Sequence, residues 1–143
     1  MMIYDTAGQE EYGALTRSHF HGAGAAILVF SSTDRNSFLA LKDWKERVLT
    51  DCDENIPMLI VQSKVDLLTL GTGSQENPED ENSIDTNIIS QTEIDDMAKE
   101  LQLPIFKVSS STNYNVKEVF ETLCDMYITG GHKFDESFLS NIS

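Results

Sequence analysis

Apolar runs of strand length alternate with segments of helical period along most of the chain. Runs at residues 24–30, 58–61 and 104–108 predict buried strands, and residues 1–5 predict another strand at the start. Between these runs, apolar side chains recur at three- and four-residue steps, which predicts three amphipathic helices. The expected buried faces of these helices are Phe38, Leu41, Trp44 and Val48; then Ile94, Met97, Ala98 and Leu101; and last Val116, Val119, Phe120, Leu123 and Tyr127.

Residues with capping chemistry mark the ends of these helices. Asp34 suits the N-cap of the first helix, and Ser90 followed by Glu93 has the spacing of a capping box at the second. Asn115 begins the third helix, and the glycine pair that starts at Gly130 ends it. The regular elements therefore stop near residue 130.

The order of strands and helices predicts an α/β fold with a mostly parallel sheet that helices cover on both faces. Crossovers between parallel strands are expected to be right-handed. Ligands in such sheets bind beyond the carboxyl ends of the strands. The loops that follow Tyr4, Val61 and Val108 are therefore the places to look for chemistry.

Charge sharpens this picture in one segment. Lys plus Arg number 10 and Asp plus Glu number 24, a net charge of −14, which argues against nucleic acid and anionic membranes as partners. Eight acidic and no basic residues lie within residues 67–98. Residues 69–86 are also poor in apolar side chains and predict a disordered acidic insertion. The domain is expected to span residues 1–129, and residues 130–143 are expected to form a flexible tail.

The remaining composition excludes several classes of protein. The two cysteines, Cys52 and Cys124, have no metal-ligand spacing and form no disulfide framework. The longest apolar run is far too short to span a bilayer, and the N-terminus does not look like a signal peptide. We therefore expect a cytoplasmic protein and a monomer.

The first loop carries groups suited to phosphate chemistry. After Tyr4 the chain reads Asp5-Thr6-Ala7-Gly8-Gln9. An Asp in this place can hold a water bound to Mg²⁺, a Gly lets a backbone N–H approach a terminal phosphate, and a Gln can orient an attacking water. A capped turn that leads into a helix is the alternative interpretation.

The other two loops carry groups suited to a purine base. The carboxylate of Asp66 could accept hydrogen bonds from guanine and would leave adenine unpaired, while the stem of Lys64 lies over the base. Backbone N–H groups of the stretch 109–111 could donate to guanine O6. Taken singly, Lys64 with Asp66 is a solvated charge pair, and the stretch 109–111 is a polar turn.

Taken together and in this order, the three loops resemble those of a Ras-superfamily GTPase of the Rab family. The resemblance covers residues 1–129, and it implies a three-layer fold like that of the P-loop nucleotide hydrolases. The segments 28–38 and 115–120, with Val61-Gln62 and Asp66-Leu67-Leu68, are similar to the Rab branch linked to Hedgehog signalling and primary cilia.

The resemblance implies GTP or GDP and Mg²⁺ as cofactors, GTP hydrolysis as the activity, and a switch in vesicle or ciliary traffic as the role. Binding would use the following residues: Asp5, which holds Mg²⁺ through water, Thr6, Ala7, Gly8 near the γ-phosphate, the catalytic Gln9, and, around the base, Ser63, Lys64, Asp66, Ser109, Ser110 and Ser111. Effectors and regulators would dock on the switch helix at Tyr12 and Phe20. The protein would lie at endomembranes or the cilium only peripherally.

The chain departs from the family pattern in several places. It contains no G-x-x-x-x-G-K-[ST] loop, which in the family binds the phosphates, and no first strand or first switch segment. Ser63 replaces the usual Asn, Ser110-Ser111 replaces Ala-Lys, and His21 replaces an Arg. No cysteine for prenylation stands at the end. These features predict an N-terminally truncated GTPase whose catalysis is absent or very weak.

The absent first strand also bears on stability. Such a central strand buries three or four large apolar side chains, each contributing roughly 1.5–3 kcal/mol. The loss of about 5–10 kcal/mol is comparable with the net stability of a domain, about 5–15 kcal/mol. The chain is therefore expected to be unstable, rearranged or dependent on a partner. Two rival hypotheses are a non-catalytic interaction module that uses the switch helix and the acidic insertion, and an unrelated α/β domain with chance motifs.

Overall fold

Three parallel strands form the centre of the computed structural model, which describes residues 2–5, 20–52, 56–70 and 89–130. They are β1 (Ala26–Ser31), β2 (Met58–Ser63) and β3 (Ile105–Lys107), in the order β1-β2-β3. The register pairs Ala26 with Met58 and Ile60 with Ile105. The predicted parallel α/β arrangement is confirmed, with strand ends that differ from the prediction by one or two residues.

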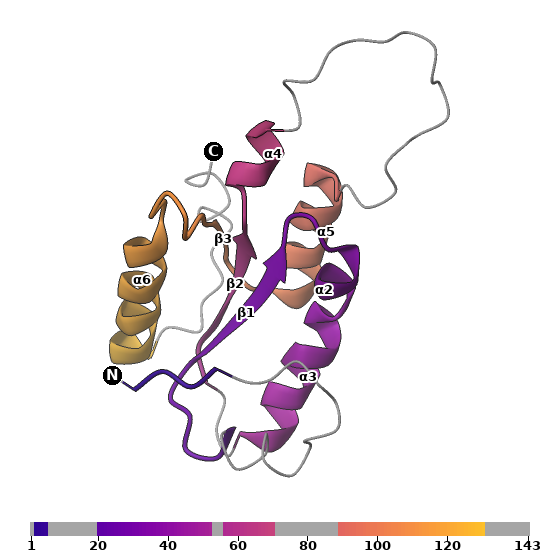
Figure 1. Ribbon diagram of the computed structural model, residues 1–143. Coiled ribbons are helices and arrows are strands. Elements are labelled where there is room, and N and C mark those ends of the chain that lie inside the picture. Colours follow the sequence, from indigo (N-terminus) through magenta and orange to yellow (C-terminus); the bar gives the residue numbers. More distant parts are fainter. Residues whose placement is uncertain (1, 6–19, 53–55, 71–88, 131–143) are drawn as a thin grey trace, which may run out of the picture.

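Helices cover the two faces of this sheet unequally (Figure 1). The helices α2 (Arg35–Leu39), α3 (Leu41–Asp51) and α5 (Gln91–Leu101) lie on one face, and α6 (Val116–Thr129) lies alone on the other. The short helix α4 (Asp66–Leu70) follows β2 at the upper end of the sheet in that view. The described residues thus form three layers.

The larger hydrophobic core fills the space under α2, α3 and α5. Its centre is Phe30 of β1, which is 1% exposed and packs edge to face on Phe38 of α2, with ring centroids 5.2 Å apart. Leu41 and Val48 of α3 and Ile94 of α5 are buried in the same cluster. The helical periodicity correctly identified these side chains as the buried faces.

The smaller core lies between the sheet and α6. Leu59 and Val61 of β2 contact Val119 and Leu123 of α6 in a buried cluster, and Ile27 of β1 is only partly buried against it. Tyr127, predicted on the buried face of α6, is exposed. Among the described residues α6 is the one helix on this face, and a single helix is too narrow to cover a three-stranded sheet completely.

The helix caps follow the chemistry read from the sequence at two of three positions. Asp34 accepts hydrogen bonds from the N–H groups of Asn36 and Ser37, and Ser90 with Glu93 forms a complete capping box. Asn115 does begin α6, but its side chain donates to the carbonyl of Lys107 at 3.0 Å. The third cap therefore ties α6 to β3 instead of closing the helix.

Two sequence predictions about the sheet are wrong. Residues 2–5 form no strand, and Met2, Ile3 and Tyr4 are exposed, because no strand among the described residues lies alongside them to pair with their backbone. The apolar run of β1 predicted a strand buried on both faces, yet Val29 is 54% exposed. Among the strands that the structure describes, β1 stands at the edge of the sheet.

The predicted insertion begins two residues too early. Thr69 and Leu70 belong to α4, since the turn after Lys64 continues as a helix. Residues 71–86 of that prediction, and the predicted tail from residue 131, lie outside the described residues. No described helix is both long enough and apolar enough to cross a lipid bilayer.

Candidate functional site

The loops after β2 and β3 meet at the carboxyl end of the sheet. The N–H of Val65 donates to the carbonyl of Val108 at 3.4 Å, which joins the two loops through their backbones. Lys64 adopts a left-handed conformation with φ of 59°, and Asp66, two residues later, opens α4. A non-glycine residue at positive φ is uncommon and occurs where the surrounding structure specifies it.

Asp66 is held in place by the serine loop. The hydroxyl of Ser109, which is buried, donates to Asp66 Oδ1 at 2.7 Å and lies 3.0 Å from the hydroxyl of Ser111. The hydrogen bond from Ser109 is the main cause that keeps the pKa of Asp66 below its usual range, with a further contribution from Ser111, although burial acts against it. The side chain is therefore a fixed carboxylate at neutral pH.

The serine loop itself is braced by residues that the motif analysis did not select. Ser109 pairs with Tyr114 in an antiparallel bridge, with N–H···O distances of 3.2 and 2.9 Å. The N–H of Thr112 donates to the Ser109 hydroxyl at 3.3 Å. Asn113 and Asn115 both take positive φ, which asparagine tolerates better than most residues. The two asparagines were the signal in the sequence for a tight loop at this point.

Ser63, which the motif places beside the base, makes its described contacts within the sheet. Its hydroxyl donates to the carbonyl of Phe30 at 2.9 Å, and its own carbonyl accepts from the hydroxyl of Ser32 at 2.7 Å. A hydroxyl has a single proton, so in this arrangement Ser63 cannot also donate to a base. Its described contacts join the carboxyl ends of β1 and β2.

The structure groups the predicted base-binding residues, and of the predicted phosphate-binding residues it describes only Asp5. Ser63, Lys64, Asp66 and the serine loop lie at one end of the sheet. Residues 2–5, with Asp5 at their end, lie near the amino ends of the strands, opposite α4 (Figure 1). Residues 6–9 and Tyr12 lie outside the described residues. Phe20, predicted as a docking residue, is buried in the larger core.

The two implied cofactors fit the described residues unequally. A fixed carboxylate beside backbone and hydroxyl donors matches the hydrogen-bonding pattern of guanine, so a base can be accommodated at Asp66. No group of three metal-ligating side chains gathers among the residues that the structure describes. The described residues therefore do not form a Mg²⁺ site, and we assign no chemical step to the metal.

Comparison with known proteins identifies the class to which this fold and site belong. The model of the Ras family matches residues 1–129, so the chain is a member of the Ras family. It is 32% identical over 126 residues to rat GTP-binding protein Rab-3D and to human Ras-related protein Rab-3A, and equally identical to bovine Ras-related protein Rab-3C. These alignments cover 88% of this chain, 50% of the first two relatives and 48% of the third.

The chain therefore spans about half the length of the curated relatives that it matches. The match confirms the resemblance to a Rab-type small GTPase and the fold class that it implied.

Proposed function

We propose that the chain supplies the guanine-recognising part of a Rab-type switch in membrane traffic. The observation that carries this proposal is the carboxylate of Asp66, fixed by the hydroxyl of Ser109 at 2.7 Å next to the left-handed Lys64. The family and the Rab relatives support guanine nucleotide as the ligand.

Base selection at this site follows from hydrogen-bond matching. The two oxygens of Asp66 can accept from the N1 and N2 groups of guanine, whereas adenine presents an acceptor at N1 that would leave a carboxylate oxygen opposed. The half-exposed position of Asp66 leaves its carboxylate within reach of a base. Lys64, which is exposed, can lay its stem over the ring and keep its ammonium in water.

The phosphate end of the ligand is proposed to bind weakly. Within the 143 residues no G-x-x-x-x-G-K-[ST] loop is present to surround the phosphates with N–H groups. Gln9, with Gly8 and Asp5, is the proposed hydrolytic group by family position. We expect GTP turnover by these residues to be very slow, and Gln9→Leu to abolish what turnover is measured.

Exchange of the base specificity tests the proposal directly. The purified chain is titrated with fluorescent GDP, and GDP, ADP and xanthosine diphosphate are compared as competitors. Asp66→Asn replaces an acceptor by an amide that can donate to the 2-oxo group of xanthine and accept from its N1 group, so preference should pass from guanine to xanthine.

Asp43→Asn is the matched control for this exchange, because Asp43 is an exposed carboxylate on α3. It should leave the preference for guanine unchanged. Equal competition by ADP and GDP in the unaltered chain would show that Asp66 does not read the base.

A second candidate function is a protein-interaction module that does not depend on nucleotide. The feature that favours it is the acidic segment, with eight acidic and no basic residues within residues 67–98. Binding of a protein partner that is unchanged by saturating GDP would support it, and nucleotide-dependent binding would refute it. The Hedgehog and cilium branch is a finer proposal that rests on the segments 28–38 and 115–120, and localisation of the tagged protein tests it.

A further inference from the structure

Two serine hydroxyls and a carboxylate form a chain of hydrogen bonds at the proposed base-recognition site. The hydroxyl of Ser109 donates to Asp66 Oδ1 at 2.7 Å, and the hydroxyl of Ser111 lies 3.0 Å from that of Ser109. The backbone N–H of Thr112 donates to the same Ser109 hydroxyl at 3.3 Å. Ser109 therefore has the carboxylate on one side and two other polar neighbours. We call Ser111, Ser109 and Asp66 the hydroxyl chain.

The direction of the hydroxyl chain follows from counting protons. An ionised carboxylate only accepts hydrogen bonds, whereas a serine hydroxyl has one proton and two lone pairs. The single proton of Ser109 is directed at Asp66, so the oxygen of Ser109 accepts from its other two neighbours. The 3.0 Å separation of the two hydroxyls allows either of them to donate, and only donation by Ser111 agrees with this count.

A tight turn between β3 and α6 returns Ser111 to the side of Ser109. The backbone groups of Ser109 and Tyr114 exchange two hydrogen bonds, at 3.2 and 2.9 Å, and the N–H of Asn113 donates to the carbonyl of Ser110 at 3.4 Å. Asn113 takes a φ of 57° within this turn. Ser111 is exposed, whereas Ser109 is 1% exposed. The closed turn therefore places an accessible hydroxyl against a buried one.

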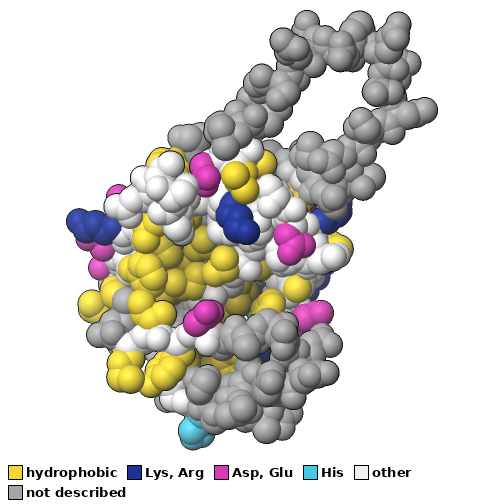
Figure 2. Space-filling model, viewed as in Figure 1, with side chains coloured by type: hydrophobic (Ala, Val, Ile, Leu, Met, Phe, Trp, Pro, Cys, Tyr) yellow, Lys and Arg dark blue, Asp and Glu magenta, His cyan; other side chains and the backbone are white. Residues whose placement is uncertain are grey.

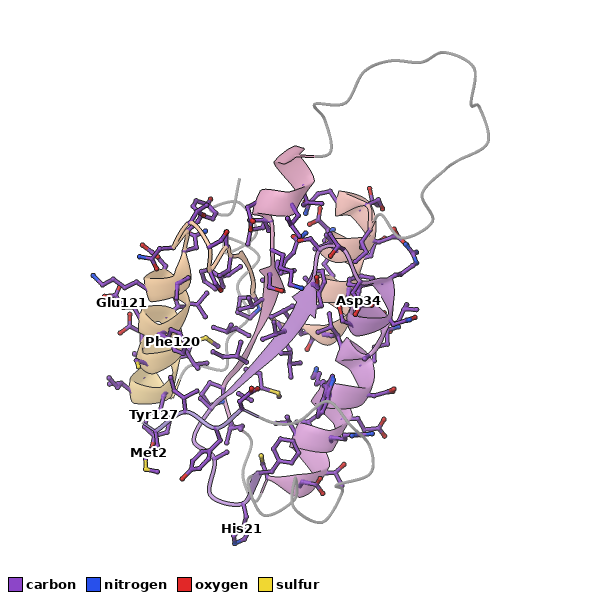
Figure 3. All side chains as sticks on the ribbon, in the orientation of Figure 1. Met2, His21, Asp34, Phe120, Glu121 and Tyr127 are labelled. Atoms are coloured by element: carbon purple, nitrogen blue, oxygen red, sulfur yellow. The ribbon has the colours of Figure 1, made fainter. Side chains whose placement is uncertain are left out.

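Hydrogen bonds hold the Asp66 side chain in its charged form. The groups that lower the pKa of Asp66 are the hydroxyl of Ser109 first, then the hydroxyl of Ser111 and the backbone N–H of Asp66 itself. Figure 2 shows mainly uncharged polar groups and backbone above α6, where this turn lies in Figure 1. On α6, Lys117 pairs with Glu121 at 3.3 Å, and Figure 3 shows Glu121 on the side of the helix away from the sheet. The geometry of neutral donors therefore sets the orientation of Asp66.

We propose that Ser111 is a positioning residue for base recognition, whose hydroxyl orders Ser109 and, through Ser109, the carboxylate of Asp66. The proposal rests on the proposed function, since it concerns how the same carboxylate meets a guanine. Hydrogen bonds in a chain polarise one another, so a Ser109 that accepts from Ser111 is a stronger donor to Asp66. A carboxylate that is already held in one orientation loses less conformational freedom when a base binds. Ser111, which the motif places beside the base, then acts through Ser109 instead of touching the base.

Titration of Asp66 by carbon-detected NMR, in the purified full chain without nucleotide, tests whether Ser111 orders the carboxylate. Ser111→Ala should raise the pKa of Asp66, by less than Ser109→Ala does, and Ser111→Thr should keep it low because the hydroxyl is retained. In a chain that already carries Ser109→Ala, Ser111→Ala should have little further effect, since the group through which it acts is gone. Thr112→Ala is the matched control, because it removes an exposed hydroxyl from the same turn and keeps the backbone N–H.

Competition against fluorescent GDP measures the consequence for the base. Ser111→Ala should weaken the binding of GDP about two- to tenfold, the range that corresponds to one neutral hydrogen bond. The binding of ADP should not change, because adenine does not pair with the carboxylate, so the preference for guanine over adenine falls by the same factor. Ser111→Thr and Thr112→Ala should both retain the affinity for GDP and the preference of the unaltered chain. Circular dichroism confirms that each variant is folded.

The two measurements fail in different ways. Equal competition by GDP and ADP in the unaltered chain would refute base recognition, and with it the role of Ser111. A preference for GDP in the unaltered chain, with the pKa of Asp66 and the affinity for GDP both unchanged in Ser111→Ala, would show that solvent water replaces the hydroxyl, which overturns the role of Ser111 alone. An equal effect of Ser111→Ala with and without the Ser109 hydroxyl would show that Ser111 acts on Asp66 directly, and would overturn the order of the hydroxyl chain.

Discussion

Removal of the Phe30 ring should show how much of the stability rests on the core beneath α2 and α3. The side chain is 1% exposed, and its ring packs on Phe38 with centroids 5.2 Å apart and planes at 62°. Phe30→Ala loses both the burial and the ring contact and leaves a cavity, which typically costs about 3–5 kcal/mol. For a chain of this size each kcal/mol lowers the melting temperature by roughly 2–4 °C, so the expected decrease is about 6–20 °C.

Chemical denaturation followed by circular dichroism measures the cost of Phe30→Ala, and a double-mutant cycle with Phe38→Ala isolates the ring contact. An edge-to-face pair contributes about 0.5–1.5 kcal/mol beyond the area that it buries, and we expect a coupling energy of that order. Leu39→Ala, on the exposed side of α2, should cost well under 1 kcal/mol. A loss below about 1 kcal/mol for Phe30→Ala would show that Phe30 is not at the centre of the core.

Four further predictions concern polar groups. Ser109→Ala should raise the pKa of Asp66, because it removes the main hydrogen bond to the carboxylate, and a carbon-detected NMR titration measures this shift. Ser90→Ala should destabilise the protein by about 1 kcal/mol through loss of the N-cap, measured in urea. The hydrogen bond from the Ser90 backbone is the main cause that lowers the pKa of Glu93. Glu93 therefore stabilises the fold at pH values above its pKa in the unfolded chain, and this contribution is lost as the pH falls through its pKa in the folded protein. Acid unfolding measures the loss. Gln62→Leu should be nearly neutral. Gln62 is 2% exposed, and its side-chain carbonyl oxygen has no partner among the described residues, so the loss of one hydrogen bond is offset by removal of that oxygen.

Neighbouring substitutions provide controls for these polar predictions. Thr112→Ala removes an exposed hydroxyl from the serine loop and should leave the pKa of Asp66 unchanged. Thr50→Ala, on the exposed side of α3, should have little effect on urea unfolding. An unchanged Asp66 titration in Ser109→Ala would contradict the assigned cause. A loss above about 3 kcal/mol for Gln62→Leu would show that the oxygen is satisfied in solution, for example by a buried water.

The sequence by itself determined the class of fold and pointed to the loops that we propose to recognise the base. Strand-length apolar runs and helical periodicity are local properties, so the three strands and the helices α5 and α6 were correctly predicted from them, while the first predicted helix is divided at Ala40 into α2 and α3. Lys64 and Asp66 were selected from the motif that follows β2 together with the family resemblance, and their role in reading a base stays a prediction. The capping box at Ser90 was equally local.

Tertiary structure alone decided which strand is an edge and which loop residues support the site. An apolar run such as β1 looks the same whether or not a neighbour covers it, so the exposure of Val29 in the described structure could not be read from the residues. The contact between Ser109 and Asp66 joins residues far apart in the chain, and the use of Ser63 to tie β2 to Phe30 depends on the register of two strands. Such features arise from pairing across the sheet, which no local pattern encodes.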